Sequence, residues 1–214
     1  MLRQLVIFDL NGVLGRKVVA TDAAFLDEAA ACGAALLSVR GLVFLPRPGA
    51  FDLVRGLLHH NIDVAIWSSM SESNVIDIAR AMMGPAVFSR LAFIRGSESP
   101  TASKRIASLP VSRVGSFDGR IVIVDDTLEK ISSNPASQYV VATPFDGNPT
   151  SADIGWTFEI LRDVSDRGIR LPVSIAANTR RFFDMCSLLD RPDDSSRGRS
   201  DISDSVYDAD IATT

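Results

Sequence analysis

The sequence has little cysteine, little lysine and no long apolar run. Its 214 residues include two cysteines, Cys32 and Cys186, which lie far apart and share no metal-ligand spacing. Neither a disulfide framework nor a zinc site is therefore predicted. A reducing intracellular compartment is favoured, either the cytoplasm or the nucleus, with the mitochondrion left open. The longest apolar stretch, 34–45, is interrupted by Arg40, so a membrane-spanning helix is not expected.

Acidic charge is concentrated at the end of the sequence. Residues 190–214 contain seven aspartates and three arginines, whereas the residues before them hold 19 basic and 19 acidic side chains. Without a basic excess, nucleic-acid binding is not predicted. The composition of 190–214 offers almost nothing to bury, which predicts a disordered acidic tail after a single domain at 1–189.

Three apolar runs each lead into polar residues at their carboxyl ends. They are 4–10 with Asp9, Asn11 and Gly12, then 63–67 with Ser68 and Ser69, and then 120–124 with Asp125 and Asp126. Helical patterns at 50–60 and 71–83 alternate with them, weaker strands are predicted at 91–94 and 139–142, and a helix is predicted near 102–109. This alternation predicts a doubly wound α/β fold around a mostly parallel five-stranded sheet.

An insertion of about thirty residues separates the first run from the helix at 50–60. Within it, 22–35 is helical in pattern and 41–45 is apolar, so the insertion predicts a minimal cap and not a large lid domain. Two closing helices are predicted at 153–166 and 172–189. Their aromatic residues form either buried helix faces or, where exposed, a surface for a protein partner. The acidic tail is a second candidate surface for such a partner.

The polar residues indicate phosphoryl chemistry. The carboxyl ends of neighbouring parallel strands meet at one edge of a sheet, where ligands bind. Asp9 and the pair Asp125-Asp126 would therefore face one divalent cation such as Mg²⁺. A serine hydroxyl and a lysine suit the oxygens of a phosphoryl group, and Asp9 could attack phosphorus to form an aspartyl-phosphate. Taken singly, each motif has a plainer alternative: Asn11-Gly12 is typical of a turn, and Ser68 or Ser69 of a helix cap.

The ordered motifs resemble a known family. They are Asp9-Leu10-Asn11-Gly12-Val13-Leu14, then Arg47-Pro48-Gly49, Ile66-Trp67-Ser68-Ser69, Lys104, and Val124-Asp125-Asp126-Thr127-Leu128-Glu129-Lys130. In this order, over about residues 4–170, they are similar to the haloacid dehalogenase (HAD) superfamily. Within it they look most like the phosphatases of the RNA polymerase II C-terminal domain, the NLI-interacting-factor-like group, with their mitochondrial import-receptor relative. The resemblance implies a HAD-like Rossmannoid domain.

The resemblance also implies a role for each matched residue. Asp9 would be the nucleophile, Ser68 with Ser69 beside it would bind the phosphate, and Lys104 would steady both. Lys130 is the alternative lysine. Magnesium would be held by Asp9, the backbone carbonyl of Asn11, Asp125 and Asp126. The substrate would be phosphorylated, and a phosphoprotein fits because a minimal cap leaves the cleft open to a macromolecule.

Asn11 departs from the family pattern. Active members carry an aspartate there, which protonates the leaving oxygen and later deprotonates the attacking water, and an amide can do neither. Two functions therefore stay open. One is a magnesium-dependent phosphomonoesterase, slowed or specialised for aryl or acyl phosphates by Asn11. The other is an inactive pseudophosphatase that serves as a protein-binding or assembly subunit.

Overall fold

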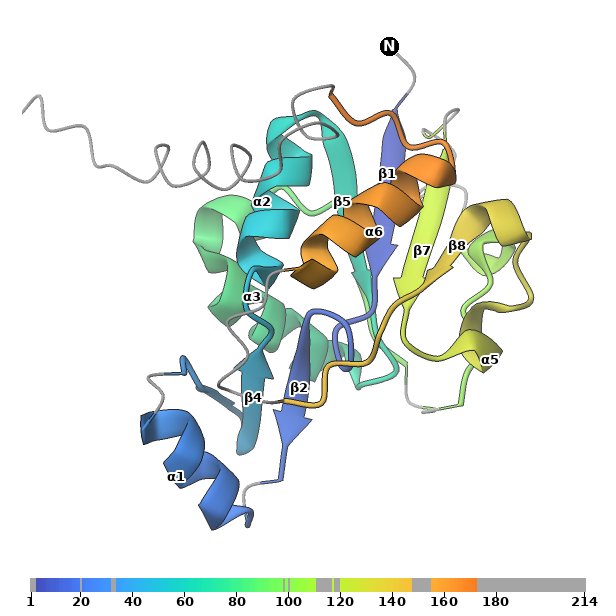
Figure 1. The fold of residues 1–214 in the computed structure, drawn as a ribbon. Coiled ribbons are helices and arrows are strands. Elements are labelled where there is room, and N and C mark those ends of the chain that lie inside the picture. Colours follow the sequence, from blue (N-terminus) through green and yellow to red (C-terminus); the bar gives the residue numbers. More distant parts are fainter. Residues whose placement is uncertain are drawn as a thin grey trace, which may run out of the picture.

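A parallel sheet forms the centre of the protein. The computed structural model describes residues 3–19, 21–31, 34–97, 99, 101–110, 117, 120–147 and 155–172. The sheet has five strands in the order β6-β5-β1-β7-β8, and every neighbouring pair is parallel (Figure 1). The strands are β1 (Gln4–Phe8), β5 (Ile62–Trp67), β6 (Ile94–Arg95), β7 (Ile121–Asp125) and β8 (Tyr139–Val141). The predicted α/β fold is confirmed.

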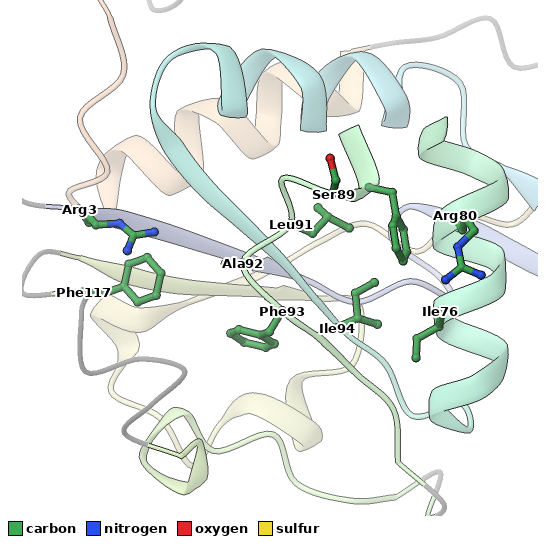
Figure 2. Close-up of a pocket in the computed structure, with 10 residues that line it drawn as sticks. Arg3, Ile76, Arg80, Ser89, Leu91, Ala92, Phe93, Ile94 and Phe117 are labelled. Carbon is green, nitrogen blue, oxygen red and sulfur yellow. The ribbon is translucent and has the colours of Figure 1, made fainter. Parts of the chain in front are cut away.

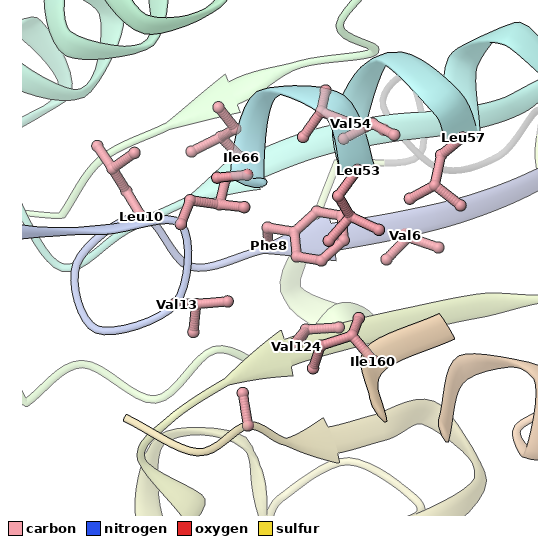
Figure 3. Packing of buried hydrophobic residues seen from close by; sticks show 14 of the residues in the cluster. Val6, Phe8, Leu10, Val13, Leu53, Val54, Leu57, Ile66, Val124 and Ile160 are labelled. Carbon is pink, nitrogen blue, oxygen red and sulfur yellow. The ribbon is translucent and has the colours of Figure 1, made fainter. Parts of the chain in front are cut away.

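Both faces of this sheet are covered, to unequal extents. The helices are α2 (Ala50–His59), α3 (Glu72–Phe88), α5 (Leu128–Ile131) and α6 (Gly155–Asp166). On one face, Val6 and Phe8 pack with side chains of α2 and α6 (Figure 3). The same cluster, the largest, also includes residues of α3. The alternate residues Leu5 and Ile7 belong to a smaller cluster that includes Ile131 of α5. Because β1 is buried on both faces, its sequence is a continuous apolar run.

The insertion between β1 and α2 forms a second, antiparallel sheet of three strands in the order β2-β4-β3. Its elements are β2 (Gly15–Val18), α1 (Ala23–Ala31), β3 (Leu37–Val39) and β4 (Leu42–Pro46). The sequence predicted α1 and the apolar part of β4, but it did not predict β2 or β3. These strands are only four and three residues long, and β2 exposes both Arg16 and Lys17, so neither shows an apolar run.

The helix predicted at 102–109 is wrong. The structure has a single 3₁₀ turn there, Ile106–Ser108, and Arg105 before it is extended. The cause is Asn134, whose side chain accepts a hydrogen bond from the Ile106 N–H (2.8 Å) and donates one to the Lys104 carbonyl (2.7 Å). A contact across 30 residues therefore overrides the local helical preference.

Helix α3 is longer than predicted. The sequence predicts its end at residue 83, just before Gly84-Pro85, but the helix runs to Phe88 across a kink at Gly84 (φ 67°, ψ 165°). Proline suits the first turn of a helix because it has no N–H to pair there. Pro85 therefore opens a final turn after the kink.

Part of the predicted carboxyl-terminal region is not described. The first closing helix is present as α6. Except for Pro172, the second closing helix predicted at 172–189 and the tail predicted at 190–214 lie outside the described residues. Within the described ranges, none of the helices combines the length and the apolarity that crossing a membrane requires.

Candidate functional site

Three strand ends of the parallel sheet bring polar side chains to one edge. Asp9 follows β1, Ser68 follows β5, and Asp125 is the last residue of β7. Phe8 is in register with both Ile66 and Val124, and the Asp9 N–H donates to the Val124 carbonyl (2.8 Å). Asp9, Ser68 and Asp125 are 2%, 1% and 0% exposed. Polar groups so deeply buried need partners or a ligand.

Lys104 supplies the positive charge at this edge. Its side chain is 2% exposed, and its Nζ lies 3.1 Å from Asp9 Oδ2 and 2.5 Å from Asp125 Oδ2. The Lys104 N–H donates to the Lys130 carbonyl (2.7 Å), and Asn134 donates to the Lys104 carbonyl. Of the two lysines that the sequence offered, Lys104 is therefore the one whose side chain contacts the acids, while Lys130 contributes a backbone oxygen.

Three carboxylates converge beside that ammonium. Asp9, Asp125 and Asp126 each offer one oxygen, and these oxygens all lie within 4.8 Å of one another. Two ligands on opposite sides of Mg²⁺ stand about 4.2 Å apart, so only small side-chain rotations separate this arrangement from a ligand set. The carboxylates are also oriented by the backbone: Leu10 N–H donates to Asp9 (2.7 Å) and Thr127 N–H donates to Asp125 (2.8 Å). Hard oxygen donors of this kind fit magnesium.

Burial and the nearby charge of Asp125 raise the pKa of two of these carboxyl groups, Asp9 and Asp126. Burial raises the pKa of Asp9 from 3.8 to about 6, against the opposing effect of Lys104, and the charge of Asp125 adds to the rise. The pKa of Asp126 is also raised, first by burial and then by Asp125. One ammonium does not balance three carboxylates, so a bound divalent cation would relieve the excess negative charge.

Gly12 allows the first and third strand ends to approach. Its φ is +94°, a conformation that favours glycine, and a Cβ there would lie 2.1 Å from Asp126 Oδ2. The Asn11-Gly12 pair therefore forms a tight turn, as is typical of this dipeptide. The same turn, however, brings the loop after β1 against Asp126.

Asn11 is exposed, two residues after Asp9. Its Oδ1 accepts a hydrogen bond from the Lys17 N–H of β2 (2.8 Å). The side chain thus links the loop after β1 to the insertion sheet. An amide in this place can bind, but it cannot supply or remove a proton.

The two serines after β5 do not cap the following helix. The residue at the N-cap of α3 is Ser71, which leaves Ser68 and Ser69 outside the capping alternative. The Ser68 hydroxyl accepts a long contact of 3.5 Å from the Met70 N–H. The Ser69 hydroxyl oxygen is buried and has no hydrogen-bond partner within the part of the chain that the structure describes. Within the described residues neither hydroxyl donates a hydrogen bond, so each keeps a donor for a further partner.

One loop at the site was missed by sequence reasoning. Residues 142–147 follow β8, the Ala142 N–H donates to the Asp125 carbonyl (2.9 Å), and the Phe145 N–H donates to the Gly12 carbonyl (2.8 Å). The loop therefore touches two of the acid-bearing segments. These contacts use backbone atoms, so no residue type in the sequence signalled them.

A separate hollow lies away from the acids. It has a volume of about 730 Å³ and is lined by Arg3, Phe117, three residues of α3 and residues 89 and 91–94 (Figure 2). Arg3 precedes β1, whereas Asp9 follows it, so the hollow reaches the opposite end of that strand. The acid cluster and this hollow are different places on the molecule.

Comparisons with known proteins give matches among solved structures only. No protein-family model and no curated protein matches the chain. A structure of the RNA polymerase II CTD phosphatase Fcp1 of fission yeast, bound to beryllium fluoride, is similar at 10% identity and a TM-score of 0.49, over 87% of this chain and 63% of that one. The chain thus spans less than two thirds of that phosphatase structure.

Two structures of CbbY from Rhodobacter sphaeroides are also similar. One, in complex with phosphate, is 18% identical with a TM-score of 0.39, and the other, a variant in complex with xylulose-(1,5)bisphosphate, is 19% identical with a TM-score of 0.38. Each match covers 60% of this chain and 80% of that chain. Both CbbY structures match a smaller part of this chain than the Fcp1 structure does.

Proposed function

We propose that this protein is a magnesium-dependent phosphomonoesterase that acts through an aspartyl-phosphate on Asp9. The observation that carries the proposal is the buried contact of Lys104 with both Asp9 and Asp125, beside Asp126. A structural ion pair needs one carboxylate for one ammonium. A surplus of buried carboxylates at the carboxyl ends of parallel strands is typical of a site that binds a cation and a phosphorylated ligand.

Each residue of the site has its own role in the proposed reaction. Magnesium, held by Asp9, Asp125, Asp126 and the Asn11 backbone carbonyl, would neutralise charge on a phosphoryl oxygen. An Asp9 carboxylate oxygen attacks phosphorus, and the bond from phosphorus to the leaving oxygen breaks. The Ser68 hydroxyl and the Lys104 ammonium bind the transferred phosphoryl oxygens. Water then hydrolyses the acyl phosphate and releases inorganic phosphate.

Asn11 restricts the substrate class. An alkoxide leaving group, as from phosphoserine, needs a proton when it departs, whereas an aryl or acyl phosphate has a leaving group that needs little protonation. We therefore expect aryl and acyl phosphates to be the better substrates. A phosphoprotein remains a candidate because the insertion is small.

The second candidate function is a pseudophosphatase that binds a protein partner. It is favoured by the Asn11 side chain, whose oxygen is bonded to the Lys17 N–H and whose amide has no acid-base capacity. The sequence predicted a partner surface on the late helices if their aromatic residues are exposed. On α6, however, Trp156 is buried, with 6% of its surface exposed. The residues of the predicted acidic tail lie outside the described ranges.

The test of the proposed function is an aryl-phosphate assay with Mg²⁺. Wild-type turnover is expected to fall to background in Asp9→Asn, because an amide is not a nucleophile toward phosphorus. Chelation of the metal should abolish turnover as well. Asp166→Asn, an exposed position on α6, serves as the matched control and should keep wild-type rates. Wild-type protein that binds magnesium but shows neither turnover nor a hydroxylamine-sensitive phosphoenzyme would instead support the pseudophosphatase.

Magnesium binding should weaken as the pH falls below about 6. The pKa of Asp9 is raised to about 6, so below this pH a proton occupies the carboxylate and must leave before the metal binds. The affinity measured by titration calorimetry is expected to drop by up to about tenfold per pH unit below 6 and to change little from pH 7 to 8. The Asp9→Asn variant should lose most of this dependence. An unchanged wild-type affinity at pH 5 would contradict the assignment of Asp9 as a ligand.

A further inference from the structure

Arg47 lies where several segments of the chain meet, outside the acid cluster. It follows β4, and its backbone N–H donates to the Leu14 carbonyl (2.9 Å) in the loop after β1. Its guanidinium stacks over the Trp156 ring of α6, with 4.2 Å to the ring centroid, and its Nη1 donates to the Thr143 carbonyl (2.9 Å). Arg47 therefore joins the insertion, α6 and the loop at 142–147.

The loop at 142–147 leads from Arg47 to the acids. Phe145 lies 5.5 Å from the Arg47 guanidinium and is 8% exposed, and its side chain is held in the hydrophobic cluster of the insertion. Its backbone N–H donates to the Gly12 carbonyl (2.8 Å). Gly12 in turn lies directly against Asp126. A displacement of this loop would thus alter the position of Asp126 relative to Asp9.

Arginine suits this position better than lysine because its charged group is planar. A planar guanidinium can lie flat on an indole ring and donate an in-plane N–H at the same time. The indole is itself fixed, because Trp156 Nε1 donates to the Pro48 carbonyl (2.8 Å). A lysine ammonium is a point charge on a flexible stem, so it can make the hydrogen bond or the ring contact but does not enforce both.

We propose that Arg47 is a positioning residue: it holds the 142–147 loop against Gly12 and thereby sets the distance between Asp126 and Asp9. The mechanical part of this inference concerns the loop alone. Its consequence for magnesium rests on the proposed function. The two parts are measured separately.

The first measurement is hydrogen exchange of the Phe145 amide, which reports its bond to the Gly12 carbonyl. In Arg47→Lys this amide is expected to exchange about tenfold faster. The lysine cannot both lie on the Trp156 ring and hold the Thr143 carbonyl, so the loop is held less firmly. Arg80→Lys is the matched control, since Arg80 also lies over an aromatic ring, Phe88 at 4.9 Å, but on the outer part of α3. It should leave Phe145 exchange unchanged. Unchanged exchange in Arg47→Lys would overturn the proposal.

The second measurement is the Mg²⁺ affinity of the same proteins. Arg47→Lys should bind magnesium about tenfold more weakly, as expected when a group that orients a ligand is removed. In Arg47→Ala, millimolar methylguanidinium should restore slow Phe145 exchange and part of the affinity, whereas methylammonium should not. A rescue by both cations alike would contradict the role of the planar group. If Arg47→Lys does not fold, Arg47→Gln, which keeps a planar N–H donor, takes its place.

The outcomes separate this inference from the proposed function. If wild-type protein does not bind magnesium but Phe145 exchange rises in Arg47→Lys, the metal site fails and the positioning role stands. If wild-type protein binds magnesium and Arg47→Lys changes neither exchange nor affinity, the positioning role fails and the metal site stands.

Discussion

Replacing Asn11 by aspartate is expected to raise the turnover of an alkyl phosphate by about 10²- to 10⁴-fold, the usual worth of general acid-base catalysis. The change is isosteric and the position is exposed, so it costs little in packing. One oxygen of the new carboxyl can keep the bond to the Lys17 N–H, which leaves the other to protonate the leaving group. An aryl phosphate should gain much less. The measurement is the ratio of kcat/KM for the two substrates.

Asn61→Asp is the control for this prediction. It adds the same charge at an exposed residue just before β5, at the opposite end of the strand from Ser68. It should leave both substrates unchanged. If Asn11→Asp folds, binds magnesium and still gains nothing with either substrate, the roles assigned to the residues around Asp9 are wrong.

Removing the charge of Lys104 is expected to destabilise the metal-free protein strongly. In Lys104→Met the buried carboxylates of Asp9 and Asp125 lose their ammonium and face each other uncompensated. Breaking a buried pair in this way costs about 3 to 5 kcal/mol. Urea unfolding without metal measures the loss. Arg105→Met, an exposed neighbour, is the control and should cost under about 0.5 kcal/mol.

The loss in Lys104→Met should depend on pH in a defined direction. Lys104 lowers the pKa of Asp9, so without it Asp9 holds its proton more tightly still. When the pKa of a carboxyl group is higher in the folded than in the unfolded protein, the folded state binds the proton more tightly. The stability that this proton provides is present at low pH and is lost as the pH rises through the folded-state pKa. The destabilisation should therefore be larger at pH 8 than at pH 5, and magnesium should stabilise the variant more than it stabilises the wild type. A loss that does not vary with pH would point to packing alone.

The central sheet could be predicted from the sequence because its strands are buried on both faces. The residues around Phe8, Ile66 and Val124 form continuous apolar runs, and each run ends where a polar residue enters the site. The sequence alone therefore places Asp9, Ser68 and Asp125 at one edge of the sheet. Their position follows from strand direction alone.

Contacts between distant segments could not be predicted. The extended backbone around Lys104 depends on Asn134, so a local helical pattern at 102–109 was misleading. The contact of Arg47 with Thr143 joins a side chain to a carbonyl 96 residues later. A carbonyl is present at every residue, so the sequence contains no mark of which one is used.

The insertion begins and ends at neighbouring points of the fold. Gly15 at the start of β2 pairs with Pro46 at the end of β4. The two ends of the insertion are therefore neighbours in space. A segment with adjoining ends can be exchanged for a longer one at little entropic cost, about 0.6 kcal/mol for each doubling of its length. This segment can thus be replaced by a longer one while β1, which Asp9 follows, keeps its neighbours β5 and β7.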